Sequence, residues 1–274
     1  MNLYHSKSEP SVNKFAETAK ERYEQGLQEA DQPFSGWDFS YVTGSERLQS
    51  GMLPWSYGTM ARRLLNQTER MLDMGTGGGE MLSRLCPLPP YTCATEGYLP
   101  NIPIAEERLQ PLGVKVLPVT DDSQLPFADG EFDLILNRHE SYDEQEVRRI
   151  LSVGGLFLTQ QVGWSDCREI NDRLGIPMPA DYAGWELDRA VLQLEQCGFR
   201  ILEQREATPA QRFYDIGALV YYLKTIPWQV PDFKVKQFRQ PLMDIHMEME
   251  QNGFWEVQQK RFVILAAKES RHEG

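Results

Sequence analysis

The sequence feature that most constrains the fold is a glycine-rich loop at residues 75–79, placed between a predicted strand and a predicted helix. Glycine at such a junction permits positive φ and lets a ligand lie against bare backbone. The helix that follows offers unpaired N–H groups to an anionic or carboxylate ligand. The loop alone is a weak signal, because loops of this composition also occur as plain turns.

Predicted strands and helices alternate around this loop. Strands are predicted over residues 70–74, 91–95, 114–119, 132–137, 156–162, 199–205 and 261–268, and helices over residues 57–66, 80–85, 102–110, 144–151 and 186–197. Such alternation is typical of βαβ units in a parallel sheet. We therefore predict an α/β fold, a Rossmann-like, doubly wound and mostly parallel seven-stranded sheet.

The chain is predicted to have four parts. They are a helical N-terminal cap segment (residues 1–57), a Rossmann-like core (58–208), a helical insertion (209–253) and the final strand of the core (254–270). The insertion and residues 30–57 are expected to form the acceptor side of a pocket, which the aromatic-rich stretch at residues 37–55 would line. A dimer interface, and hence a homodimer, is the alternative use of the insertion.

Charge and composition exclude several classes of protein. Asp and Glu number 40 against 28 Lys and Arg, which gives a net charge of −12 and makes nucleic acid and anionic membranes poor partners. No apolar signal segment and no 18-residue apolar run is present. The 4 cysteines form no metal-binding spacing, so we expect reduced thiols, no metal site and a cytoplasmic location.

Glu96 directly follows the second predicted strand. An acidic side chain in that place can accept two hydrogen bonds from the hydroxyls of a ribose. Dinucleotide dehydrogenases and methyltransferases both use this geometry, so Glu96 indicates a nucleoside ligand without choosing between them. The alternative is a solvated loop carboxylate.

Two further segments indicate a particular family. Residues 120–135 closely resemble the Asp-Ala-x-x-Leu-Pro-Phe-x-Asp-x-x-Phe-Asp segment of class I S-adenosylmethionine-dependent methyltransferases, and residues 146–158 resemble that family's Arg-x-Leu-x-Pro-Gly-Gly stretch. The order and spacing of the glycine loop, Glu96 and these two segments match those of the family. The resemblance covers roughly residues 60–205 and the final strand, and is closest to the small-molecule, ubiquinone-biosynthesis-like branch. Val153 replaces the usual proline, and Asp122 replaces a small residue.

The resemblance implies S-adenosylmethionine as cofactor. The residues that it implies for cofactor binding all lie at predicted strand ends or in the loops that follow: Asp73, Gly75, Thr76, Gly77, Gly79, Glu96, Asp121, Asp122, Asn137 and Arg138. It places Asp73 at the amino group and Asp121 at the adenine amine, with the Asp122 backbone beside the ring. Which of these two neighbouring carboxylates faces the ligand is left open.

Methyl transfer is an in-line displacement, so the protein must mainly align the acceptor and exclude water. A general base is needed only where the acceptor loses a proton. His139 and Glu140, just past the fourth predicted strand, are the candidate catalytic residues, and Gln160 and Gln161 end the fifth strand at the same rim. The alternative for His139 is an ordinary histidine bonded to a nearby carbonyl or to Glu140.

The sequence thus predicts an S-adenosylmethionine-dependent methyltransferase that acts on a small-molecule acceptor. The alternatives are an RNA or protein methyltransferase, a nucleotide-binding oxidoreductase, and a non-catalytic binder of S-adenosylmethionine. The acidity of the chain disfavours RNA, and no Tyr-x-x-x-Lys pair supports the oxidoreductase.

Overall fold

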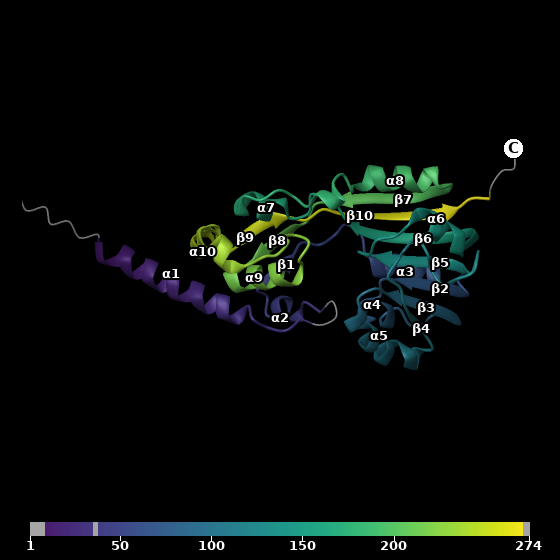
Figure 1. The fold of residues 1–274 in the computed structure, drawn as a ribbon, viewed down its shortest axis with the longest axis horizontal. Coiled ribbons are helices and arrows are strands. Elements are labelled where there is room, and N and C mark those ends of the chain that lie inside the picture. The colour runs from purple at the N-terminus through teal and green to yellow at the C-terminus, as the bar shows by residue number, and fades with distance from the viewer. Residues whose placement is uncertain (1–8, 35–37, 271–274) are drawn as a thin grey trace, which may run out of the picture.

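The chain forms two lobes (Figure 1). The structure, a computed structural model, describes residues 9–34 and 38–270. Trp37, the first aromatic of the stretch expected to line the pocket, lies outside the described residues. No helix in the described part of the chain is both long and apolar enough to cross a bilayer.

The larger lobe is built on a seven-stranded sheet in the order β4-β3-β2-β5-β6-β10-β7, in which only β10 runs antiparallel to its neighbours. Its strands are β2 (Arg70–Met74), β3 (Tyr91–Glu96), β4 (Lys115–Pro118), β5 (Phe132–Arg138), β6 (Leu151–Val162), β7 (Phe199–Ala207) and β10 (Arg261–Lys268). This confirms the predicted fold class. The seven strands predicted from sequence are these seven, with ends that differ by a few residues.

Helices cover both faces of this sheet. They are α3 (Tyr57–Leu65), α4 (Glu80–Ser83), α5 (Ile102–Leu109), α6 (Glu144–Ile150) and α8 (Leu187–Gln196). Side chains alternate between the faces along each strand, so that Ile135 packs with α6 and α8 while Leu134 packs with α3, α4 and α5. Two apolar cores therefore enclose the sheet.

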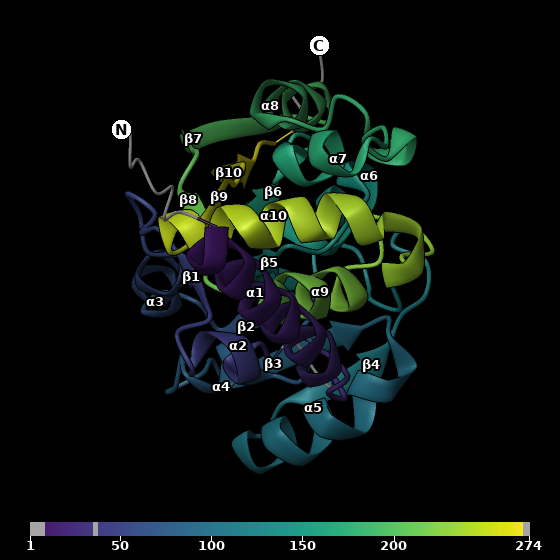
Figure 2. The ribbon, with the colours of Figure 1, turned by 90° about the vertical axis from the view of Figure 1, so that its left-hand side faces the viewer.

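The smaller lobe has its own antiparallel sheet, in the order β1-β8-β9, and a third apolar core. Its elements are β1 (Leu48–Ser50), β8 (Ala210–Phe213), β9 (Trp255–Gln258), α1 (Glu9–Glu29), α2 (Ser40–Thr43), α7 (Arg168–Leu174), α9 (Ile216–Thr225) and α10 (Arg239–Asn252). Figure 2 shows α1 and α10 lying across the outer side of this lobe. There the buried His246 ring donates from Nε2 to the carbonyl oxygen of Ala19, 2.7 Å away.

A two-stranded ribbon joins the lobes. Ala207 of β7 lies opposite Arg261 of β10, and three residues further along β8 begins at Ala210, opposite Gln258 of β9. The backbone N–H of Gln259 bridges the break by donating to the Pro209 carbonyl at 2.9 Å. The insertion, which the sequence predicts as helical, thus also carries two strands.

Asp166 fastens the smaller lobe to the start of β10. Its Oδ1 accepts from the backbone N–H of Lys260 at 2.6 Å and from the guanidinium of Arg261. Both side chains are buried, with exposed fractions of 9% for Asp166 and 12% for Arg261. Removal of one partner leaves a buried, unpaired charge.

Asp166→Ala is expected to lower the free energy of unfolding by roughly 3–5 kcal/mol, the usual cost of breaking a buried ion pair. The matched control is Asp172→Ala, because Asp172 pairs with Arg168 at the surface, with both side chains more than half exposed. That change should cost at most about 1 kcal/mol. Urea unfolding measures both, and equal losses would contradict the role of Asp166.

Candidate functional site

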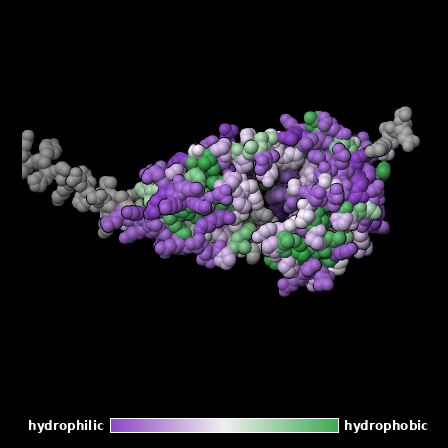
Figure 3. All heavy atoms as spheres, in the orientation of Figure 1, coloured by the Kyte–Doolittle hydropathy of each residue, from purple (hydrophilic) through white to green (hydrophobic). Residues whose placement is uncertain are grey.

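The carboxyl ends of the parallel strands β2, β3, β5 and β6 meet at the edge of the large sheet that faces the smaller lobe (Figure 1). Figure 3 shows a hollow between the two lobes at this edge. In open α/β sheets, ligands bind outside the carboxyl ends of the strands. Ten of the twelve site residues predicted from sequence lie in β2, β3 or β5 or in the loop directly after β2 or β5, and Asp121 and Asp122 follow β4.

The glycine loop connects β2 to α4. Gly75 and Gly77 both have φ of +63°, a backbone conformation that residues with a side chain rarely adopt. The backbone N–H of Thr76 donates to the Thr95 carbonyl at 2.9 Å and ties the loop to the end of β3. The side chain of Glu140 lies so close over Gly75 that a Cβ there would overlap it. Gly75 therefore leaves room for the Glu140 side chain, which packs against the backbone of the loop.

Glu96 ends β3 and is almost fully buried. Its Oε2 accepts from the backbone N–H of Gly77 at 2.6 Å, and its Oε1 accepts from that of Tyr98 at 2.7 Å. Burial raises the pKa of Glu96, and these backbone hydrogen bonds oppose the rise. A carboxylate has about four lone-pair positions. Hydrogen bonds from the Gly97 backbone and the Asn101 side chain also favour the charged form of Glu96. Glu96 is therefore held by donors of the chain itself and is not the solvated loop residue of the alternative interpretation.

Two more carboxyl groups near this edge are hard to ionise. Burial raises the pKa of Asp73 to about 7, an effect that the charge of Arg138 lessens and that of Glu96 increases. Burial likewise raises the pKa of Glu140 to about 7, with further contributions from Asp122 and Glu96. Carboxyl groups thus gather beside the glycine loop, an environment that favours a positively charged ligand.

Asp121 and Asp122 face different ways. Asp121 is exposed, and its Oδ1 accepts from the backbone N–H and the hydroxyl of Ser123, which lowers its pKa. Asp122 is partly buried and accepts from the Ser141 hydroxyl at 2.5 Å, and burial raises its pKa. Of the two carboxylates that the sequence could not separate, Asp122 is therefore the one that turns toward the end of β5.

Asn137 and Arg138 end β5 and have different surroundings. The Asn137 side chain is fully buried, and its Oδ1 accepts from Thr159 at 3.0 Å and from Gln161 at 2.7 Å. Its side chain therefore braces the strand ends rather than projecting into the hollow. Arg138 is exposed, and its charge acts on Asp73 and Tyr57.

His139 has a φ of +64°, unusual for a residue other than glycine. Its backbone N–H donates to the Gln160 carbonyl at 2.8 Å, and its ring Nε2 lies 2.9 Å from Nε2 of Gln160. Solvent reaches the residue. The protein around the ring, together with the charges of Arg261 and Arg138, lowers the pKa of His139 well below its ordinary value.

Two aromatic residues, Trp55 just before α3 and Tyr57 at its start, complete the site, although no local sequence signal gave their roles. Trp55 Nε1 donates to Oε1 of Gln160 at 2.8 Å. The Tyr57 hydroxyl donates to the carbonyl of Asn137 at 3.1 Å. Their aromatic character could be read from the sequence, but their partners lie 105 and 80 residues away along the chain.

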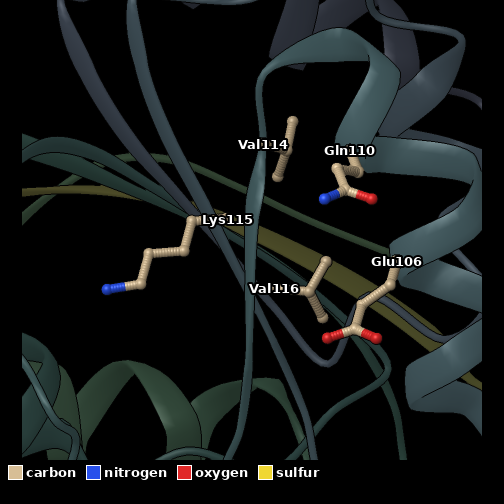
Figure 4. A pocket seen from close by; sticks show the side chains of 5 residues that line it. All are labelled: Glu106, Gln110, Val114, Lys115 and Val116. Carbon is tan, nitrogen blue, oxygen red and sulfur yellow. The ribbon is translucent and has the colours of Figure 1, made fainter.

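Other surface features lie apart from this edge. Glu106, Gln110, Val114 and Val116 line a shallow surface hollow between α5 and the edge strand β4, where Lys115 points the other way (Figure 4). A second hollow lies on the smaller lobe between α7 and β9. Among residues 9–34 and 38–270, no group of His, Cys, Asp or Glu side chains has the arrangement of a metal site. All four cysteines are free thiols.

Comparison with known structures bears on the fold alone, because the sequence identities are low. A methyltransferase candidate from Bacillus halodurans C-125 has 15% identity and a TM-score of 0.57, over 78% of this chain and 99% of its own. The YcgJ protein of Bacillus subtilis has 18% identity and a TM-score of 0.55, over 78% of this chain and 98% of its own. No curated protein matches the chain.

Comparison with family models identifies the part of the chain that holds the site. Residues 72–159 match the family described as "Methyltransferase domain". The matched segment begins in β2 and ends in β6, so it includes the glycine loop, Glu96, Asp122 and His139. This part of the chain, about a third of its length, is therefore similar to a methyltransferase domain.

Proposed function

We propose that this chain transfers a methyl group from S-adenosylmethionine to a small molecule held in the hollow between the two lobes. The observation that carries the proposal is the meeting of the glycine loop with Asp73 and Glu96 at the sheet edge beside that hollow.

The residues present fit the cofactor. The buried Glu96 carboxylate at the end of β3 suits ribose hydroxyls, and the left-handed glycines of the loop let its backbone approach a ligand. Asp73 suits an ammonium group, and the exposed Arg138 guanidinium beside it suits a carboxylate. Asp122, which turns inward, is the better candidate for the adenine than Asp121.

When bound, the cofactor supplies a methyl group on a positively charged sulfur. The chain must then hold the acceptor in line with that group and keep water out. The start of α3 and the residues before it support an enclosed acceptor site, because Trp55 and Tyr57 are hydrogen-bonded to the ends of β6 and β5. Hydrogen bonds from Ser40 lower the pKa of Asp38, and the charges of Arg108 and Arg84 add to this effect.

The enclosed position between two lobes favours a small acceptor over a macromolecule, and the net charge of −12 disfavours RNA. The purified chain should be incubated with S-adenosylmethionine labelled in its methyl group and with a cell extract separated into metabolites, RNA and proteins. Label in the metabolite fraction alone is expected. Label in RNA or protein would replace the proposal by that alternative, and cofactor binding without any transfer would favour a non-catalytic binder.

Glu96→Ala is expected to weaken binding of S-adenosylmethionine about 10- to 150-fold, because hydrogen bonds to a charged group contribute about 1.5–3 kcal/mol. The control is Glu106→Ala, since Glu106 is an exposed acidic residue of α5. Calorimetry with each variant measures the two dissociation constants. If the variants bind equally well, Glu96 does not hold the ribose.

Binding of S-adenosylmethionine is expected to strengthen as the pH rises from about 6 to about 8. Asp73 and Glu140 both have a pKa of about 7, so they gain negative charge over this interval and attract the sulfonium cation. S-adenosylhomocysteine lacks the sulfonium charge, and its affinity should change less. Calorimetry across this range measures both ligands, and a ratio of their affinities that is independent of pH would contradict the prediction.

The same titration with Asp73→Asn and with Glu140→Gln shows how much each carboxyl group contributes to the pH dependence of binding. Each change replaces a carboxyl by an amide that cannot ionise, so each should flatten part of the pH dependence. Glu106→Gln, at an exposed position, is the control and should leave the dependence unchanged.

A further inference from the structure

Three side chains from distant parts of the chain form one line of hydrogen bonds at the site. Trp55 Nε1 lies 2.8 Å from Oε1 of Gln160, and Nε2 of Gln160 lies 2.9 Å from Nε2 of His139. Trp55 and Gln160 are both buried, whereas His139 is an exposed residue. The line therefore runs from the interior to a single accessible ring.

The indole of Trp55 determines which nitrogen of the His139 ring carries the proton. An indole N–H can only donate, so the Gln160 side chain must turn its oxygen toward Trp55. Its amide nitrogen, which can only donate, then faces the His139 ring. Nε2 of His139 must accept this hydrogen bond and therefore carries no proton. A neutral imidazole with this acceptor has its proton on Nδ1.

Backbone and charge support the same state. The left-handed backbone of His139 and its N–H bond to the Gln160 carbonyl hold the ring against that side chain. Such a conformation costs free energy and persists only where the surroundings enforce it. The charged groups that act on the ring are Arg138 at the end of β5 and Arg261 at the start of β10, and both oppose a positive imidazolium.

We propose that Trp55 and Gln160 are positioning residues that hold His139 as a neutral imidazole protonated on Nδ1. His139 then donates a hydrogen bond from Nδ1 to the methyl acceptor and takes no proton from it. This second step rests on the proposed function. The acceptor class that it specifies is a molecule with a hydrogen-bond-accepting oxygen, such as a carbonyl, a carboxylate or a phenolate, near the methylated atom.

The tautomer can be observed directly by two-bond ¹⁵N–¹H NMR of the histidine rings. The chain has four histidines, and the signals lost in His139→Gln identify this one. The ring should be neutral and Nδ1-protonated throughout the range in which an ordinary histidine titrates, around pH 6.5. A ring that carries its proton on Nε2, or that becomes charged in that range, would overturn the proposal.

Two variants test the positioning residues. Trp55→Phe removes the donor that orients Gln160, so the His139 ring should gain the Nε2-protonated form and its pKa should move up toward the ordinary value. Gln160→Glu gives Nε2 a negative partner and should raise the pKa of His139 by roughly 1–3 units. An unchanged His139 signal in both variants would show that the line of hydrogen bonds does not control the ring.

The matched control is Trp164→Phe, because the Trp164 indole donates to the Pro179 carbonyl at 2.8 Å. This change removes a tryptophan hydrogen bond elsewhere and should leave His139 unaltered. Affinity for S-adenosylmethionine, measured on the same samples, reports separately on the proposed function. A chain that shows the tautomer but does not bind the cofactor would refute the methyltransferase assignment and leave the positioning intact.

The hydrogen bond from His139 to the methyl acceptor is tested separately. Its readout is the rate of transfer of labelled methyl groups to the metabolite fraction. His139→Asn keeps a side-chain N–H close to the place of Nδ1 and should retain part of the transfer, whereas His139→Ala should lose it. If His139→Asn is as inactive as His139→Ala and the rate of the unaltered chain follows the titration of His139, the ring acts as a base and the proposal fails.

Discussion

The pairing of β10 between β6 and β7 is the constraint on which the rest of the structure depends. β10 runs antiparallel to both neighbours, so the chain arrives from the smaller lobe at the edge where the parallel strands end. The strand ends and the smaller lobe are thereby held on the same side of the sheet. The buried pair of Asp166 and Arg261 lies at the point of entry. The hollow between the lobes is a consequence of this connection.

The site stores electrostatic free energy at that edge. Asp73 and Glu140 are harder to ionise in the folded chain than in water, so the folded state holds their protons more tightly than the unfolded state does. The stability that these groups contribute is present below about pH 4 and is lost as the pH rises to about 7. A cation in the hollow offsets this loss. The empty site is therefore suited to a positively charged ligand before any contact is formed.

The sequence was sufficient for the large sheet because its signals are local. The apolar strands, the glycine loop and Glu96 follow one another over a short stretch, and each residue type has a physical reason for its place. The structure of the insertion was harder to predict. β8 and β9 have four residues each, too few for a strand pattern, and both lie in or just after the insertion that was predicted to be helical. Only their pairing as an extension of β7 and β10 makes them strands.

The acceptor side could not be read from the sequence for the same reason. Glutamine at the end of β6 and histidine after β5 are ordinary residues until Trp55, 105 positions before Gln160, supplies a donor that orients them. Asp121 and Asp122 are adjacent, and nothing in their sequence distinguishes the inward carboxylate. The Ser123 and Ser141 hydroxyls do so, but Ser123 stands at a motif position that any residue can fill and Ser141 lies outside the motif.

The contact between α1 and α10 has a consequence for the order in which the chain acquires its structure. Ala19 and His246 are separated by 227 residues, and the inner side of α1 packs on α9 and α10. On the ribosome, α1 emerges long before α9 and α10, the helices that cover it. Contacts of such long sequence separation form slowly, because the entropy of closing the intervening loop is lost first. Until α9 and α10 have been made, α1 is therefore an exposed amphipathic segment within reach of chaperones.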